Sequence, residues 1–411
     1  MRIIRGKIKG LGVSRGLRGT MALIAHMVTC QFFILSFLHY FILTSCSSEQ
    51  ETPWGGEGAE VELMPCVTTF EEPAPATRAW TIPSGYSAYN ENNDPISIFF
   101  TQDEQVPEEE YFFKSNGKWR TSKTDLKAED YYLYGYAPHL EYIETTISSD
   151  PVTSQYSEGA RLTISNLHAI SNTDFCVVTA AKNGKNDYRA DADYSVTGLI
   201  RGDFCYAAQA AGEGGGKNYV YLLFDHLYAA LNITMRVDNS APYHYASLRK
   251  IKLRGLKLET AIGNTKTKDR TTATVTLKKT DGADPVTSVT YTPTIGATDV
   301  NAICAMVVPE EGDWLDKTTD ETPVKLYGCY FMPQGINRLI LTSTYDVYDT
   351  SSPTPNLIRK GCTAVNTIPI EIFTGQTTAL RRNRYTINLT VKPTFLYMMS
   401  DPDLDNPSVE F

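Results

Sequence analysis

The sequence of 411 residues is poor in histidine and lacks the motifs that carry hydrolytic chemistry. Four of its six histidines follow residue 45, namely His139, His168, His226 and His244. None of them stands in a HExxH motif, and no GxSxG nucleophile elbow occurs. Because no acid, base and nucleophile come together in the pattern, we expect no enzyme, no catalytic residue, no metal and no cofactor.

Positive charge is also scarce, with 38 Lys and Arg against 47 Asp and Glu. The net charge is −9, and the six basic residues that precede Cys46 all lie in an amino-terminal stretch without acids. Removing that stretch leaves 32 bases against 47 acids, a net charge of −15. A nucleic-acid partner is therefore excluded, since neutralising phosphates requires a basic face.

Cysteine spacing excludes two further classes of protein. The chain has eight cysteines and no CxxC pair, so neither a zinc ribbon nor a thioredoxin-like dithiol is indicated. Six cysteines follow Cys46: Cys66, Cys176, Cys205, Cys304, Cys329 and Cys362. Several lie in apolar, strand-like stretches, so we expect them to be buried as small hydrophobic side chains.

What the sequence does contain is material for β structure. Hydrophobic residues make up 42%, and 25 tyrosines and long Thr-rich runs favour strands over helices. The length indicates two domains of ordinary size, and the composition excludes a disordered or collagen-like chain.

The amino terminus has the pattern of an export signal. A basic stretch precedes a largely apolar run, Ala22 to Leu43, which ends in Leu43-Thr44-Ser45-Cys46. This ending resembles a bacterial lipobox, so 1–45 is predicted as a signal peptide and Cys46 as the lipid-bearing first residue. The alternative is an uncleaved membrane helix, and translation could start at Met1, Met21 or Met27. Ser and acidic residues directly after Cys46 resemble a tag for the outer face of the outer membrane, and two or more acyl chains would anchor the protein firmly there.

Residues 46–78 form a polar, Gly-rich and Pro-containing tether with one strand-like stretch, Val61 to Phe70. From Ala79 onward, apolar and polar residues alternate with period two, as at 231–237, 273–277 and 385–391. The continuous run from Asn301 to Val308 predicts a strand that is buried on both faces. Turn sequences such as Ser115-Asn116-Gly117 separate these strands.

These patterns predict an all-β fold of two β-sandwiches in series with few, short helices. The best boundary lies near Asp238, which gives an amino-terminal sandwich at 79–238 and a carboxyl-terminal one at 239–411.

Three sequence features resemble ligand sites only weakly. The Gly-rich stretch 212–218 lacks the first Gly and the final Ser or Thr of a phosphate loop, and a mobile hairpin loop fits it better. The alternating Asp401, Asp403 and Asp405 lack the glycine and the late glutamate of a calcium loop. His226 is expected to be a hydrogen-bonded structural residue at a strand edge rather than a ligand.

Six stretches, taken in order, resemble the fimbrillin-like family of type V pilus subunits and surface adhesins. They are the lipobox at Cys46, Thr77-Arg78-Ala79, and the runs 131–138, 224–231, 339–348 and 382–391. The resemblance implies two transthyretin-like sandwiches, a lipoprotein of the outer membrane that ends in a fimbrium, and an Arg-specific protease that cuts between Arg78 and Ala79.

The lost strand would lie within 61–70, with Val61, Leu63 and Phe70 as its marker residues, and a strand of a neighbouring pilus subunit would replace it. Stalk, tip and anchor roles stay open, as does the role of the apolar stretch 395–399. The alternative is a surface lipoprotein that binds glycans or host proteins without polymerising. Exposed aromatic residues such as Trp80, Trp119 and Tyr142 would favour it, whereas their packing in the interior would not.

Overall fold

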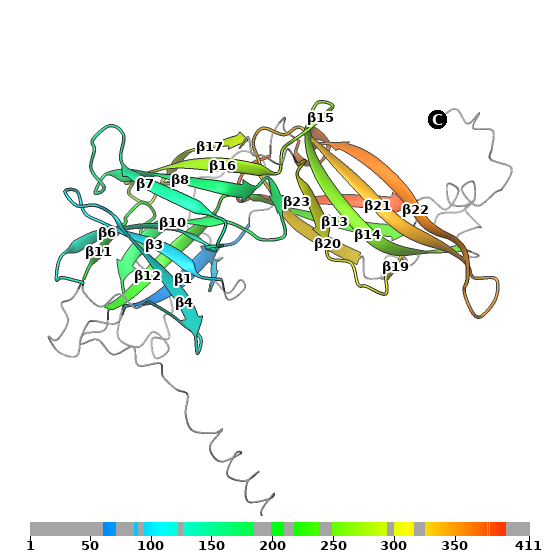
Figure 1. Ribbon diagram of the computed structural model, residues 1–411, viewed down its shortest axis with the longest axis horizontal. Coiled ribbons are helices and arrows are strands. Elements are labelled where there is room, and N and C mark those ends of the chain that lie inside the picture. The colour runs from blue at the N-terminus through cyan, green and yellow to red at the C-terminus, as the bar shows by residue number, and fades with distance from the viewer. Residues whose placement is uncertain are drawn as a thin grey trace, which may run out of the picture. The chain divides into compact units, whose positions relative to one another are not determined.

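The computed structural model describes 61–70, 86–88, 94–121, 126–184, 199–208, 218–237, 249–293, 300–315, 325–375, 377 and 379–391. Almost all of these residues lie in strands or in the turns between them, which confirms the all-β prediction (Figure 1). Helical structure in the described ranges is short, because the helix α2 (Ile370–Thr374) has only five residues. No helix there is long and apolar enough to cross a membrane.

The first sheet contains the strand that the tether carries. Its members are β1 (Val61–Thr68), β2 (Tyr86–Ala88), β3 (Ile96–Thr101), β4 (Glu108–Ser115), β5 (Lys118–Arg120), β6 (Asp130–Ala137), β10 (Cys176–Asn183), β11 (Cys205–Ala207) and β12 (Asn218–His226). Hydrogen-bonded neighbours run in the order β10-β12-β1-β5-β4-β3-β6, and β6 pairs again with β10. The pairings of this sheet therefore form a closed circuit, of which β1 is one link.

Three further sheets contain the remaining strands. The second holds β7 (Glu144–Ser149), β8 (Gly159–His168), β16 (Arg270–Lys278) and β17 (Val286–Pro293). The third holds β9 (Ile170–Ser171), β13 (Ala229–Val237), β20 (Lys325–Phe331) and β23 (Arg384–Val391). The fourth holds β14 (Arg249–Ile262), β15 (Thr265–Lys266), β18 (Ile303–Met306), β19 (Asp313–Leu315), β21 (Arg338–Asp349) and β22 (Asn356–Pro369).

Strand pairing crosses the position near Asp238 where the sequence places a domain boundary. Strand β8, which precedes it, pairs with β16, and β13 pairs with both β20 and β23. The sheets by themselves do not separate 79–238 from 239–411, and the number of transthyretin-like sandwiches stays a prediction.

Local sequence patterns explain most of the strands. Strand β16 alternates strictly between buried and half-buried residues, as its period of two predicts. The turn between β4 and β5 places Asn116 at φ 52° and Gly117 at φ 76°, the left-handed backbone that an Asn-Gly pair adopts readily.

The prediction for Asn301 to Val308 is wrong. Strand β18 covers only Ile303–Met306 and alternates between exposed and buried residues. It pairs with β14, and only one of its faces packs on the core, so Ile303 remains 47% exposed.

Gly135 in β6 allows a close approach between β6 and β3. A Cβ atom at this position would lie 2.2 Å from the backbone oxygen of Ser97 and 2.8 Å from Cδ1 of Ile98. Gly328 in β20 provides a contrast, because its nearest neighbours would be 3.6 Å from an added Cβ.

We predict that Gly135→Ala lowers the free energy of unfolding by about 2–3 kcal/mol, because β3 and β6 must move apart. The matched Gly328→Ala should be neutral or stabilise by up to about 1 kcal/mol, since alanine loses less backbone entropy on folding. Denaturant unfolding of the two variants measures this difference, and equal effects would contradict the close approach.

Candidate functional site

Strand β1 is held on both of its edges. It pairs in parallel with β12, in continuous register from Val61 opposite Asn218 to Val67 opposite Phe224. Its other edge pairs antiparallel with β5 and, further along, with β2. Figure 1 shows β1 in blue beside the green β12 of this sheet. The stretch predicted as Val61 to Phe70 is therefore an internal strand.

Both faces of β1 are buried as well. Val61 and Leu63 belong to the main hydrophobic core. Met64 and Cys66 point the other way, into a separate cluster with Ala180, Leu199, Tyr219, Tyr221 and Leu223. Burial in this cluster raises the pKa of the Cys66 thiol to about 11, so it is uncharged at neutral pH. Removing β1 would expose two apolar surfaces at once.

A buried carboxylate marks the beginning of β1. Glu62 is 1% exposed, and its Oε2 lies 3.1 Å from Nζ of Lys118 and 3.6 Å from a guanidinium nitrogen of Arg120. Both cations come from β5. A shift of β1 by one residue would turn Glu62 toward the apolar core, so this ion pair favours a single register.

The end of β1 is held by polar contacts from β12. The hydroxyl of Thr68 donates a hydrogen bond to Oδ1 of Asp225 at 2.8 Å. Nε2 of His226 lies 2.5 Å from the carbonyl oxygen of Thr68. Beyond the strand, the ring of Phe70 stacks on the imidazole of His226 with 3.7 Å between centroids. His226 thus hydrogen-bonds to the end of β1 and stacks on Phe70.

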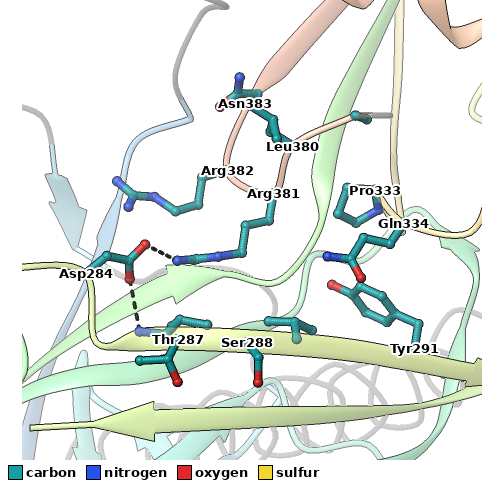
Figure 2. A pocket seen from close by; sticks show the side chains of 13 residues that line it. Asp284, Thr287, Ser288, Tyr291, Pro333, Gln334, Leu380, Arg381, Arg382 and Asn383 are labelled. Carbon is teal, nitrogen blue, oxygen red and sulfur yellow. Dashed lines mark hydrogen bonds and ion pairs between the residues drawn. The ribbon is translucent and has the colours of Figure 1, made fainter. Parts of the chain in front are cut away.

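Asp225 connects this end of β1 to a cluster of arginines. Its carboxylate is fully buried and forms an ion pair with Arg201, while Nε of Arg382 lies 3.5 Å from Oδ1 and a guanidinium nitrogen of Arg381 lies 3.9 Å from Oδ2. Asp284 pairs with Arg201 and with Arg381, and Figure 2 shows the pair with Arg381. This cluster combines three cations with two carboxylates.

The pKa shifts of Arg201 and Asp284 agree with the geometry of this cluster. Burial lowers the pKa of Arg201 to about 10, helped by the neighbouring charge of Arg382, so Arg201 remains a cation at neutral pH. Burial alone would raise the pKa of Asp284, but its ion pairs with Arg381 and Arg201 hold it below the ordinary value.

A pocket with a volume of about 410 Å³ lies beside this cluster, and Figure 2 shows the side chains that line it. Its wall combines the ion pair of Arg381 and Asp284 with amide and hydroxyl side chains. The other polar residues that line it are Thr287, Ser288, Tyr291, Gln334, Arg382 and Asn383.

The predicted site residues divide into two groups. Val61 and Leu63 lie in β1, and Phe70 lies just past its end. Cys46, Arg78 and Ala79 lie outside the described residues. Their roles in lipid attachment and cleavage therefore stay predictions.

The aromatic residues that would favour glycan binding differ in how exposed their side chains are. Trp119 is 3% exposed and packs in the core, so its expected exposure is wrong. Tyr142 is 40% exposed, with the guanidinium of Arg270 4.6 Å from its ring centroid. Trp80 lies outside the described residues.

Sequence reasoning missed Glu62, Thr68 and Asp225. A signal was present for Glu62 and Asp225, because each is a charged residue inside an otherwise apolar strand. Such a residue either interrupts a strand or is paired where it is buried, and only the long-range contacts of β1 distinguish the two cases.

Comparison with known proteins gives structural likeness only. No protein-family model and no curated protein matches the chain. A candidate cell adhesion protein of Bacteroides uniformis matches with 10% identity and a TM-score of 0.33, covering 82% of this chain and 93% of that one. One from Bacteroides fragilis matches with 9% identity, a TM-score of 0.38 and the same coverage.

The fimbrial anchor protein Mfa2 of Porphyromonas gingivalis matches with 11% identity and a TM-score of 0.24, covering 80% of this chain and 90% of that one. These are adhesins and a fimbrial protein, the kind of protein that the sequence stretches resemble. Because the three TM-scores lie below 0.5, the likeness by itself assigns neither a fold nor a function to this chain.

We predict that Asp225→Asn lowers the free energy of unfolding by about 3–5 kcal/mol, because the three arginines would then have only the carboxylate of Asp284 as a counter-charge. Asp281→Asn removes the same charge from an exposed turn near the cluster and should have almost no effect. Thermal and denaturant unfolding of both variants checks this. Equal losses in the two variants would show that Asp225 does not hold the cluster together.

Proposed function

We propose that this protein is a non-enzymatic structural subunit or tip adhesin of a cell-surface pilus. The observation that carries the proposal is the placement of β1, a strand near the amino terminus that is internal to its sheet and buried on both faces. It precedes the predicted cut after Arg78. Cleavage there would separate the strand from the chain that forms the rest of its sheet.

Loss of β1 would leave a slot with defined walls. The edge of β12 would present unpaired backbone groups along seven residue positions, and both apolar clusters would be open to water. Burial of Val61, Leu63, Met64 and Cys66 is worth roughly 10 kcal/mol before ordering costs. An exposed edge of this kind is a template for strand addition, so a neighbouring subunit can fill it.

The walls also define what an incoming strand must provide. It needs apolar side chains on both faces at its centre, because the two clusters lie on opposite sides of β1. At its start it needs an acceptor for Lys118 and Arg120. At its end it needs a backbone carbonyl that faces His226.

Export and anchoring complete the proposal. The lipobox supports lipid attachment at Cys46, which would hold the precursor at the outer face of the outer membrane until an Arg-specific protease cuts after Arg78. The released 79–411 chain would then enter a fimbrium through donor-strand exchange.

We predict that digestion of the full-length protein with an Arg-specific protease gives chains that begin at Ala79 and a ladder of oligomers in unheated gels. Arg78→Lys keeps the charge but removes the cleavage site, so this variant should stay monomeric. Amino-terminal sequencing and size-exclusion chromatography follow both changes. Chains that begin at Ala79 and remain monomeric at high concentration would contradict the proposal.

A second candidate function is binding of a glycan or host ligand without polymerisation. The pocket of Figure 2 favours it, because its amide and hydroxyl groups can hydrogen-bond to sugar hydroxyls.

For this candidate, a glycan array should show binding that Gln334→Ala in the pocket weakens at least tenfold. Gln105→Ala, in an exposed turn outside the pocket, should leave binding unchanged. An array without binding, or equal binding by both variants, would remove the pocket as a ligand site.

A further inference from the structure

Three side chains of metal-binding type meet behind the end of β1. Asp174 precedes β10, Cys176 begins β10, and His226 ends β12. Oδ2 of Asp174 lies 2.5 Å from Nδ1 of His226 and 3.4 Å from Sγ of Cys176. Sγ of Cys176 lies 3.5 Å from the same Nδ1. All three residues are at least 96% buried.

The three atoms do not have the arrangement of a catalytic triad. A triad places the nucleophile and the carboxylate on different nitrogens of the imidazole. Here Cys176 and Asp174 both contact Nδ1, and Nε2 faces the carbonyl oxygen of Thr68. The carboxylate, the thiol and Nδ1 instead converge on one point.

The spacing suits a tetrahedral cation. Zinc binds imidazole nitrogen at about 2.0 Å and thiolate sulfur at about 2.3 Å, so ligand atoms around it are separated by roughly 3.3–3.6 Å. The two distances that involve Sγ of Cys176 already have this length. The shorter contact between Asp174 and His226 would widen when the metal replaces the proton between them.

Two further details fit a metal. Oδ1 of Asp174 is buried and has no hydrogen-bond partner among the described residues, so without a cation this carboxylate is incompletely paired. The three residues offer one ligand atom each, which leaves the fourth tetrahedral position open. Histidine ligands usually donate their second ring N–H to a carbonyl or carboxylate. The carbonyl oxygen of Thr68 stands in that position for His226.

We infer that Asp174, Cys176 and His226 form a binding site for one divalent cation of the Zn²⁺ class. The mixed sulfur, nitrogen and oxygen donors favour Zn²⁺ over Ca²⁺ or Mg²⁺, which prefer oxygen alone. This inference replaces the sequence-based expectation of no metal, and it does not depend on the pilus role.

Charge and protons balance when the cation binds and protons are released. In the metal-bound site, a neutral His226 imidazole, the Asp174 carboxylate and the Cys176 thiolate would offset the two positive charges of the cation. On binding, the thiol proton and any proton on Nδ1 leave to solvent, and Nδ1 and the thiolate bond to the cation. The bound site is electrically neutral, so the cation brings no uncompensated charge into the interior.

Phe70 covers the imidazole, which makes the site closed while β1 is in place. The cation would therefore enter during folding, before β1 occupies its position. Once bound, it would keep Nε2–H of His226 directed at the carbonyl oxygen of Thr68 and so hold the end of the strand.

The test is to refold the full-length chain with Co²⁺, which reports on its own ligands. We expect one Co²⁺ per chain, with sulfur-to-metal charge-transfer absorption and the visible bands of four-coordinate cobalt, and displacement by Zn²⁺. Cys176→Ala should lose the charge-transfer band. Cys362→Ala removes another buried thiol, in β22, and should keep it.

Asp174→Asn keeps the side-chain shape and should weaken cobalt binding at least tenfold, which gives a second readout if Cys176→Ala fails to fold. A wild-type chain that refolds to its native circular dichroism without binding Co²⁺ or Zn²⁺ overturns the inference. A charge-transfer band that survives in folded Cys176→Ala also overturns it.

Discussion

The edge of β12 has to be covered, and β1 covers it. Backbone groups that are buried without a partner cost free energy, and a closed circuit of strands leaves none of its members with a free edge. Strand β1 is the link between β12 and β5 in that circuit. The main core, the second apolar cluster and the ion pair of Glu62 all depend on its presence.

The centre of β1 and its two ends contribute differently: the centre provides the affinity for the sheet, and the ends determine the register of the strand. The centre of β1 supplies apolar burial on both faces, which is strong and tolerant of different side chains. Its two ends supply polar contacts in defined places, Glu62 with β5 and Thr68 with Asp225 and His226. Such contacts penalise a strand that enters out of register, because a buried charge or carbonyl is then left unpaired. A strand from elsewhere can occupy the slot only where its pattern matches at both ends.

Much of this fold could be predicted from local pattern, and the site could not. Alternation identified β13, β16 and β23, and the strand-like stretch inside the tether identified β1, because these signals need only neighbouring residues. The order of strands, the pairing of β6 with β10 and the parallel pairing of β1 with β12 join residues far apart in sequence, and periodicity carries no information about them. The same limit explains the error at β18, since a run of apolar residues does not reveal how many of its faces are covered.

Hydrogen exchange in β12 tests the central claim most directly. The amides of 218–226 that point toward β1, and not toward β10, should exchange slowly in the intact chain, become fast once cleavage removes β1, and become slow again when the cleaved chains assemble. Amides that stay protected after β1 has gone would show that β12 does not need a partner strand. Amides that stay fast in assembled chains would show that no strand replaces β1, and either result would contradict the account.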